Sequence, residues 1–463
     1  MSRLLLVTLM SSVGCAEPER APAASSGLTP IPSSPQRSGD PDAGYAYLLY
    51  GDYIGSGLPI DIFVDFIGTT ASNPLNREGD SAAIPYVFNR FDAPNGVDIV
   101  GGVNCFACHA STLNGEFIVG LGESFSNFTT DQSFTASAAL ALLNVRYGED
   151  SPEAEAYRRI AVGTEASAPY IVTPFYGLNP AFALEQGVAA YREPETLRLT
   201  DTPVFTPPDT IPASDVPPWW NVGKKNALYY NALGQGDHAR LIMQICIVGV
   251  WDADHAADID TNFPDVLAWL EQLEPPAYPG DLDPDLATTG AAIFEQTCAR
   301  CHGTYSDDPD AETYPNLLVS IDEVGTDPVL AESYIDAPGF ADWLQSSWFA
   351  SGASPAAFVA RPGYIAPPLD GIWATAPFLH NGSVPTLDTL LDSATRPTYW
   401  QRDFGSSSYD LDRIGWPHRV VAEADAPDIY DTTLPGYTNR GHTYGDGLSA
   451  DERDALIEYL KTL

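Results

Sequence analysis

The sequence has 463 residues, enough for two or three domains that each bury a core. Acidic residues outnumber basic ones by 62 to 22, so the formal net charge at neutral pH is −40. This charge argues against binding to nucleic acid or to anionic membrane surfaces. It fits a solvated acidic surface or, alternatively, a face that docks a basic partner protein.

The N-terminal segment has the pattern of an export signal. Arg3 supplies a positive charge, and a short apolar stretch and several small residues follow it. Ser12-Val13-Gly14-Cys15 resembles a lipoprotein cleavage site with Cys15 as the lipidated residue, and ordinary secretion is the alternative. We predict a leader at 1–15, a flexible linker at 16–40, and a location in the periplasm or outside the cell, with or without a lipid anchor.

The next portion, residues 41–285, contains the first of two Cys-x-x-Cys-His motifs, at 105–109. The segment 110–135 is polar and rich in Gly, Ser and Thr, which predicts a loop. Further along, Met243 and Cys246 lie in an apolar run and are predicted to be core residues. The apolar spacing over 264–274 predicts a helix.

The last portion, residues 286–463, begins after a Pro-rich, acidic boundary at 274–285. A helical pattern at 290–297 leads into the second Cys-x-x-Cys-His motif, at 298–302. Near the end, Ser449 and Glu452 form the pattern of a capping box that starts a closing helix. No apolar run of transmembrane length is present, so no membrane-spanning helix is expected.

The two motifs have the spacing of covalent haem attachment. Each thiol adds to one porphyrin vinyl group, and the adjacent histidine binds the iron from the same side. A zinc site would pair its Cys-x-x-Cys units closely in sequence, and a redox dithiol does not need the histidine. The sequence therefore predicts two covalently bound haem c groups, on Cys105, Cys108 and His109 and on Cys298, Cys301 and His302.

The group on the opposite face of each iron decides the function. A protein that only passes electrons fills both faces, whereas one that activates O₂ or peroxide leaves one iron open. After the leader the only methionine is Met243, so at most one haem can have His/Met ligands. The histidines outside the motifs are His238, His255, His380, His418 and His442.

Residues 368–387 carry a longer pattern, which runs from Pro368-Leu369-Asp370-Gly371 through Leu379-His380-Asn381-Gly382 to Leu387. It resembles the signature of bacterial di-haem cytochrome c peroxidases and MauG-type enzymes. It is closest to the branch of the di-haem rubber oxygenases and their fatty-acid oxygenase relatives. Further similarities are Arg396-Pro397, Leu434-Pro435-Gly436 and Asn439-Arg440-Gly441-His442. With the motifs and their flanking helices, we expect a mainly α fold of two cytochrome c-like haem domains, at 41–285 and 286–463, with long irregular loops.

The resemblance implies different roles for the two haems. The haem on His109 would react, and the haem on His302 would have His442 as its second ligand and relay electrons. Trp219 or Trp220 would lie between the haems, and His380 would lie near one of them. The oxidant would be H₂O₂ or O₂, with a hydrophobic unsaturated substrate and a redox-partner protein as further partners.

The sequence also departs from the family pattern. It is shorter than the rubber oxygenases, and Ala366-Pro367 stand where a basic residue is usual before the Pro-Leu of the signature. No distal acid of the peroxidase type can be placed. We therefore predict an exported di-haem oxidoreductase, peroxidase-like or oxygenase-like. The alternatives are a pure electron-transfer protein and a non-catalytic relative that docks to a complex.

Overall fold

The computed structural model describes residues 27–463 except 210, 307, 309 and 310. Helices account for 38% and strands for 14%, so the architecture is mixed α/β with several small sheets. Helix predominates as predicted, but the expectation of a mainly α protein underestimated the strands. The predicted leader at 1–15 and linker residues 16–26 lie outside the described residues. No helix among the residues described has both the length and the apolar character needed to cross a bilayer.

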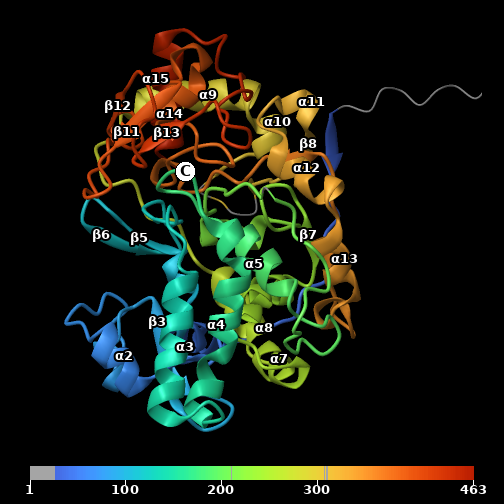
Figure 1. Ribbon diagram of the computed structural model, residues 1–463. Helices are drawn as coiled ribbons and strands as arrows, with labels where there is room; N and C mark the ends of the chain where they lie inside the picture. Colours follow the sequence, from blue (N-terminus) through green and yellow to red (C-terminus); the bar gives the residue numbers. More distant parts are fainter. Residues whose placement is uncertain (1–26, 210, 307, 309–310) are drawn as a thin grey trace, which may run out of the picture.

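The N-terminal half contributes the helices in the lower part of Figure 1, around which the first hydrophobic core forms. Most of them are short, as expected for a chain with 40 prolines and 38 glycines. They are α1 (Pro41–Tyr50), α2 (Ile60–Phe66), α3 (Ser133–Tyr147), α4 (Pro152–Ile171), α5 (Ala181–Ala189), α6 (His238–Met243), α7 (Ala253–Asp260) and α8 (Phe263–Leu270). Helix α8 confirms the helix predicted over 264–274, although it ends earlier.

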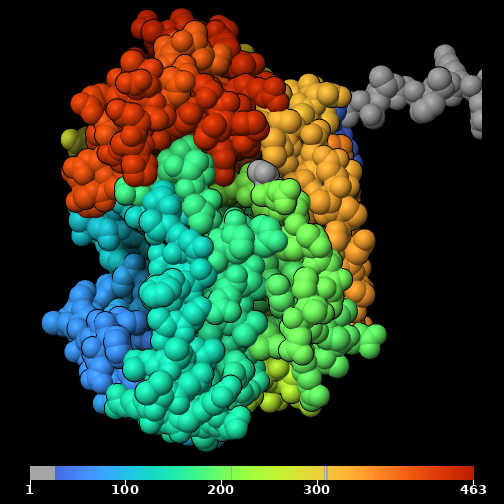
Figure 2. Space-filling model, viewed as in Figure 1, coloured from blue at the N-terminus to red at the C-terminus, as the bar shows by residue number. Residues whose placement is uncertain are grey.

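Most of the C-terminal half forms the upper part of the molecule, in yellow to red, while an orange segment that includes α13 runs down beside the N-terminal helices (Figures 1 and 2). Helices α9 and α15 pack against each other there, and the predicted capping box of Ser449 and Glu452 is confirmed at the start of α15. The helices are α9 (Pro284–Thr297), α10 (Ala299–His302), α11 (Ile321–Val324), α12 (Val329–Asp336), α13 (Gly339–Ser346), α14 (Leu387–Leu391) and α15 (Ala450–Leu460).

The strands form small antiparallel sheets, and two of these sheets join distant parts of the chain. In the first, β8 (Leu317–Ser320) lies between β1 (Leu28–Pro30) and β10 (Gly363–Ile365). In the second, β7 (Gly234–Gly236) pairs with β9 (Ala356–Phe358). The others are β2 (Gly57–Pro59) with β4 (Asp98–Val103) and β3 (Phe88–Asp92), β5 (Ala110–Leu113) with β6 (Glu116–Val119), and β12 (His418–Val420) with β11 (Tyr399–Arg402) and β13 (Ile429–Asp431).

The loop predicted over 110–135 was wrong in its first part. Strands β5 and β6 form a hairpin whose two-residue turn is Asn114-Gly115, with φ values of 49° and 82°. Both residues adopt the left-handed conformation that a two-residue hairpin turn requires, and Asn-Gly is the sequence that accepts it best. The helix α3 then begins at Ser133.

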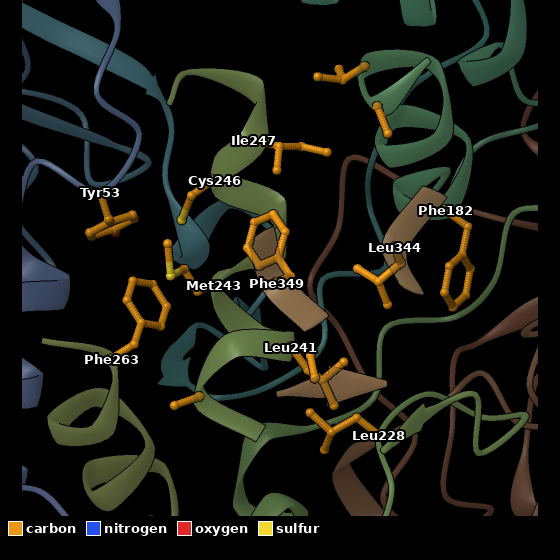
Figure 3. Close-up of a cluster of buried hydrophobic side chains, with 14 of the residues drawn as sticks. Tyr53, Phe182, Leu228, Leu241, Met243, Cys246, Ile247, Phe263, Leu344 and Phe349 are labelled. Carbon is orange, nitrogen blue, oxygen red and sulfur yellow. The ribbon is translucent and has the colours of Figure 1, made fainter. Parts of the chain in front are cut away.

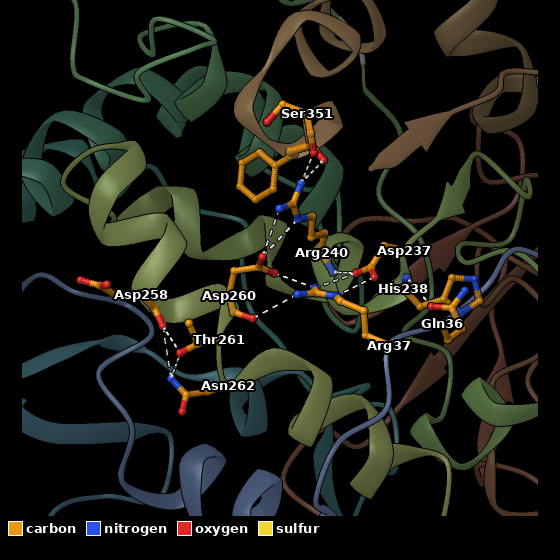
Figure 4. A network of polar contacts seen from close by, with 11 residues as sticks. Gln36, Arg37, Asp237, His238, Arg240, Asp258, Asp260, Thr261, Asn262 and Ser351 are labelled. Carbon is orange, nitrogen blue, oxygen red and sulfur yellow. Dashed lines mark hydrogen bonds and ion pairs between the residues drawn. The ribbon is translucent and has the colours of Figure 1, made fainter. Parts of the chain in front are cut away.

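The flexible linker predicted over 16–40 is also wrong for its described part. Strand β1 pairs with β8, and Arg37 lies in a network of polar contacts (Figure 4). The Arg37 guanidinium contacts Asp237 at 2.8 Å and Asp260 at 2.6 Å. Pro- and Ser-rich composition predicted a tether, but a partly buried arginine paired with two carboxylates fixes this segment to the domain.

The first hydrophobic core draws residues from both halves of the chain (Figure 3). Met243 and Cys246 are fully buried in it, which confirms their prediction as core residues. Leu344 and Phe349, from beyond residue 286, pack in the same cluster. The domain boundary near residue 285 stays a prediction. Side chains from before and after this boundary pack together in the first hydrophobic core.

Candidate functional site

The C-terminal motif lies at the junction of two helices. Helix α9 ends at Thr297, and Cys298 precedes the single turn α10 that carries the rest of the motif. The N–H groups of Cys301 and His302 both donate to the Cys298 carbonyl at 3.0 Å. This turn places both thiols and the imidazole at one end of α9, against the same cavity.

His302 is held in a defined tautomer. Its Nδ1 lies 2.8 Å from the Pro367 carbonyl oxygen, which can only accept, so Nδ1 carries the proton. Nε2 is left with its lone pair free for a ligand. Burial lowers the pKa of His302, which favours the neutral imidazole that a metal needs.

His442 faces His302 across the cavity. The two ring centres lie 6.3 Å apart, with an angle of 65° between the ring planes. A metal bonded at about 2 Å to one nitrogen of each ring would stand roughly 3 Å from each ring centre, so this spacing fits one iron between two imidazoles. Burial and the neighbouring His302 lower the pKa of His442 to about 3, which also favours the neutral ligand form.

The loop that carries His442 is tightly constrained. His442 has a φ of 46°, which is uncommon for a residue other than glycine, and its N–H donates to Val324 at 2.7 Å. At the preceding Gly441, a Cβ would lie 2.2 Å from the backbone of Gly325 and of Thr326. Only glycine at 441 therefore allows this close approach.

Arg396 anchors the same loop, a role that its place in the sequence did not reveal. It is half-buried, and its guanidinium donates to five backbone carbonyl oxygens at 2.6 to 3.3 Å. The acceptors belong to Thr389, Leu390, Asn439, Gly441 and His442. In the sequence, only the family similarity of Arg396-Pro397 pointed to this residue. Its anchoring role could not be predicted, because the acceptors are backbone atoms, which any residue type supplies.

A cavity of about 570 Å³ separates the two histidines. This volume lies in the range of pockets that bind cofactor-sized ligands. Cys298, Cys301, His302, His442 and His380 all line it. The remaining wall is mostly apolar, with Phe294, Ile372, Phe378, Leu387, Leu390, Leu391, Leu456 and Leu460. Two thiols, two imidazoles and an apolar slot form a donor set that fits a haem c.

His380 is buried in the wall of this cavity. Its ring stacks on Tyr364 with centres 4.0 Å apart, and its Nε2 has no hydrogen-bond partner among the described residues. Burial lowers its pKa to about 4. The structure therefore places this predicted residue beside the C-terminal motif, as a neutral side chain with one unpaired nitrogen.

The N-terminal motif occupies a different environment. Asn104 caps the 3₁₀ turn Cys105–Ala107, and the Cys105 carbonyl accepts from the N–H of Cys108 and of His109. The His109 ring stacks on Trp219, with centres 4.7 Å apart and planes at 17°. Burial lowers the pKa of His109 to about 3, an effect that the nearby Pro217 backbone partly opposes.

Trp219 and Trp220 belong to different cores although they are adjacent in the chain. Trp219 packs against His109, whereas Trp220 donates from Nε1 to the Asp370 carbonyl at 2.8 Å, within the C-terminal half. Pro217 and Pro218, just before them, line the C-terminal cavity. We call residues 217–225 the shared wall, because this segment contacts the surroundings of both motifs.

Three of the four motif thiols lack the character of a reactive dithiol. Burial raises the pKa of Cys105 to about 12 and of Cys298 to about 11, and it also raises the pKa of Cys108. A redox-active Cys-x-x-Cys pair needs a lowered thiol pKa instead. The two motifs therefore fit attachment of a porphyrin better than dithiol exchange.

Comparison with known families finds a match within the C-terminal half. Residues 363–401 match the family model described as RoxA-like, cytochrome c-like. The matched stretch includes β10, His380 and Arg396, which all lie near the cavity. A RoxA-like cytochrome c-like domain implies a haem protein and suggests haem c as the cofactor.

Two curated relatives, both uncharacterized proteins of Sinorhizobium fredii, are similar to this chain. The protein y4iJ is 33% identical over 253 residues, which cover 41% of this chain and 41% of the relative. The protein y4iM is 32% identical over 292 residues, which cover 54% of this chain and 64% of the relative. The chain therefore matches less than two thirds of either relative's length.

Proposed function

We propose that this chain is an exported di-haem c-type oxidoreductase. One haem is attached at Cys105 and Cys108 and activates peroxide or O₂. The other is attached at Cys298 and Cys301 and relays electrons to it. The RoxA-like match in residues 363–401 and the presence of two attachment motifs support this proposal.

The difference between the two histidine environments is the observation that carries the proposal. His302 has a second imidazole, His442, at a spacing that fits ligation from both sides. The ring contact described for His109 is with Trp219, whose side chain is no iron ligand. A second imidazole thus accompanies the C-terminal motif and not, in the ring contacts of the described residues, the N-terminal one, which supports different ligation of the two irons.

Haem iron supplies one-electron redox chemistry and, where an axial position is free, activation of O₂ or peroxide. The chain's own residues hold and separate these two tasks. The Pro367 carbonyl fixes the His302 tautomer, and the Arg396 contacts hold the His442 loop. The shared wall carries Trp219 in one core and Trp220 in the other, which supports a role for this pair in electron passage between the haems.

Carbon monoxide binding to the reduced holoprotein tests the central claim. CO binds only an iron with an open or weakly held position, so we expect a shifted Soret band for about half of the haem. A variant with Cys105→Ser and Cys108→Ser should lose the shifted part, and the pair Cys298→Ser and Cys301→Ser should keep it. No shift in the unmodified protein would rule out the enzyme and favour a pure electron carrier.

The substrate class follows the RoxA-like branch, which favours oxygenation of an unsaturated hydrophobic compound over peroxide reduction. Oxygen uptake with a polyunsaturated lipid, measured beside peroxide consumption with a reduced donor, separates these two activities. Turnover in neither assay, with normal CO binding, would favour a non-catalytic relative.

A further inference from the structure

A porphyrin in the C-terminal cavity would bring two propionate groups into a mostly apolar space. Carboxylates buried in a protein are stable only when cations or hydrogen-bond donors compensate their charge. The usual basic residue before the signature is missing, since Ala366-Pro367 stand there and both line the cavity. A compensating cation or hydrogen-bond donor must therefore come from another part of the wall.

Two basic side chains line the cavity, Lys225 and Arg300. The Arg300 side chain is 64% exposed and pairs with Glu323 at 2.9 Å, so a protein carboxylate already compensates its charge. For Lys225, by contrast, the described residues provide neither an ion pair nor a side-chain hydrogen bond. Lys225 is thus a cation at the cavity wall without a counter-charge from the protein.

Lys224, one residue earlier, is by contrast ion-paired with protein carboxylates. Its Nζ contacts Glu312 at 2.8 Å and Asp370 at 2.7 Å. The sequence has only three lysines, so two of the three are adjacent in the shared wall. One is neutralised by protein carboxylates, and the other faces the cavity.

The other polar groups of this wall do not neutralise Lys225. Asp215 also lines the cavity, but it accepts from the Tyr230 hydroxyl at 2.9 Å. Burial raises the pKa of Asp215 to about 8, so this carboxyl is largely protonated at neutral pH. Lys225 belongs to the shared wall and lines the C-terminal cavity.

We propose that Lys225 binds a propionate of the haem attached at Cys298 and Cys301, and so raises the reduction potential of that haem. This inference rests on haem binding by the C-terminal motif, as proposed above, and not on what reacts at the other haem. A positive charge at the propionate stabilises the reduced iron, which carries one positive charge less than the oxidised iron. The lysine also contributes to holding the porphyrin in one orientation.

The test is a redox titration of the full-length holoprotein, followed through the EPR signal of the low-spin iron. Lys225→Gln should lower the ratio of reduced to oxidised haem about tenfold at a fixed potential, which equals about 59 mV for one electron. Lys225→Arg should keep most of the potential because it keeps the charge. Resonance Raman bands of the propionates should change in both variants, because the donor changes in each.

Lys224→Gln is the matched control, since it removes the same charge one residue away. It should shift the potential less and leave the propionate bands unchanged. Equal effects of Lys224→Gln and Lys225→Gln in both measurements would overturn the proposal, as would a shift confined to the other haem. If Lys225→Gln does not incorporate haem, unchanged propionate bands in Lys225→Arg would overturn it instead. A negative CO result combined with the Lys225 effects would reject only the enzyme function.

Discussion

In the proposed function, His442 sets the character of the C-terminal haem from outside the attachment motif. It lies far from Cys298 in the sequence, yet its ring centre is 6.3 Å from that of His302. His442→Ala should turn the C-terminal haem from low-spin to high-spin, because the second axial ligand is lost. EPR of the oxidised holoprotein measures this change. His418→Ala, outside the cavity on β12, should leave the spectrum unaltered. A persistent low-spin signal in His442→Ala would show that another residue is the ligand.

Arg396 acts on the proposed ligand His442 through the backbone. Arg396→Gln removes most of the donors that satisfy five carbonyl oxygens, so we expect a loss of about 1–3 kcal/mol in unfolding free energy. The low-spin fraction should also fall, because the His442 loop loses its anchor. Urea unfolding and EPR on one preparation measure both effects. Arg413→Gln, which removes an exposed pair with Asp388, is the control and should change neither. An intact low-spin signal in a destabilised Arg396→Gln would mean that the arginine only supports the fold.

Glu185 gives stability a pH dependence. Burial raises its pKa to about 8 from an ordinary 4.5, and its Oε2 has no partner among the described residues. Between these two pH values the unfolded chain is ionised at this residue while the folded chain is protonated. Stability therefore falls as pH rises through this window, by about 1.4 kcal/mol per pH unit at most, and the loss is complete above about pH 8.

Glu185→Gln should remove this contribution, so the variant should gain stability over the natural protein as pH rises from about 5 to about 8. Urea midpoints of both proteins across this range provide the measurement. Glu195→Gln, at an exposed glutamate, is the control, and its urea midpoint should change with pH as that of the natural protein does. Parallel pH profiles for Glu185→Gln and the natural protein would mean that Glu185 is ionised in the fold.

At the residue scale, the sequence predicted the groups with a fixed chemical pattern. Spacing singled out the motif histidines and cysteines, and family resemblance singled out His442; their binding of haem stays a prediction. Arg396 and Lys225 were not identified, because one binds backbone carbonyls and the other is defined by the absence of a protein counter-charge. Such roles depend on tertiary contacts that no local pattern encodes.

At the scale of elements, the contact between α9 and α15 depends on one small residue. A Cβ at Gly290 would lie 1.9 Å from the Ala455 carbonyl oxygen and 2.8 Å from the Tyr459 Cβ. Gly290→Ala should therefore push the helices apart and cost about 1–3 kcal/mol, despite the better helix propensity of alanine. Thermal or urea unfolding of the holoprotein measures this loss. Gly447→Ala, where a Cβ meets nothing within 4 Å, should lie within about 0.5 kcal/mol of the natural protein. Equal stability of the two variants would show that the helices adjust freely.

Elements with a strong local signal were the predictable ones. The capping box of Ser449 and Glu452 fixed the start of α15, and apolar spacing located α8. The β5–β6 hairpin was missed although Asn114-Gly115 is a strong turn signal, because the polar composition around it suggested a loop. Strand β1 carries no such signal, since three residues gain their structure only by pairing with β8.

The acidic balance acts on the molecule as a whole. With a net charge of −40, the acidic side chains repel one another more strongly in the compact state than in the unfolded chain. Raising NaCl from about 0.05 to about 0.5 M should therefore increase the urea midpoint, because the Debye length falls well below 10 Å. Choline chloride at the same concentrations should act alike if screening is the cause. A midpoint that is constant or falls with salt would show that local ion pairs, such as those of Arg37, outweigh the overall repulsion.

The pairing of β1 with β8 also limits when this part of the molecule can fold during synthesis. Leu28 is synthesised roughly 15–60 s before its partner Val319, at ordinary rates of translation. Val319 and Ile365, from the same sheet, line the C-terminal cavity, so that wall stays open until nearly the whole chain has been made. Until this sheet forms, the thiols of Cys298 and Cys301, partly buried in the finished fold, border an incomplete cavity. The topology thus leaves a time window for an attachment enzyme to reach the cysteines before the protein closes around them.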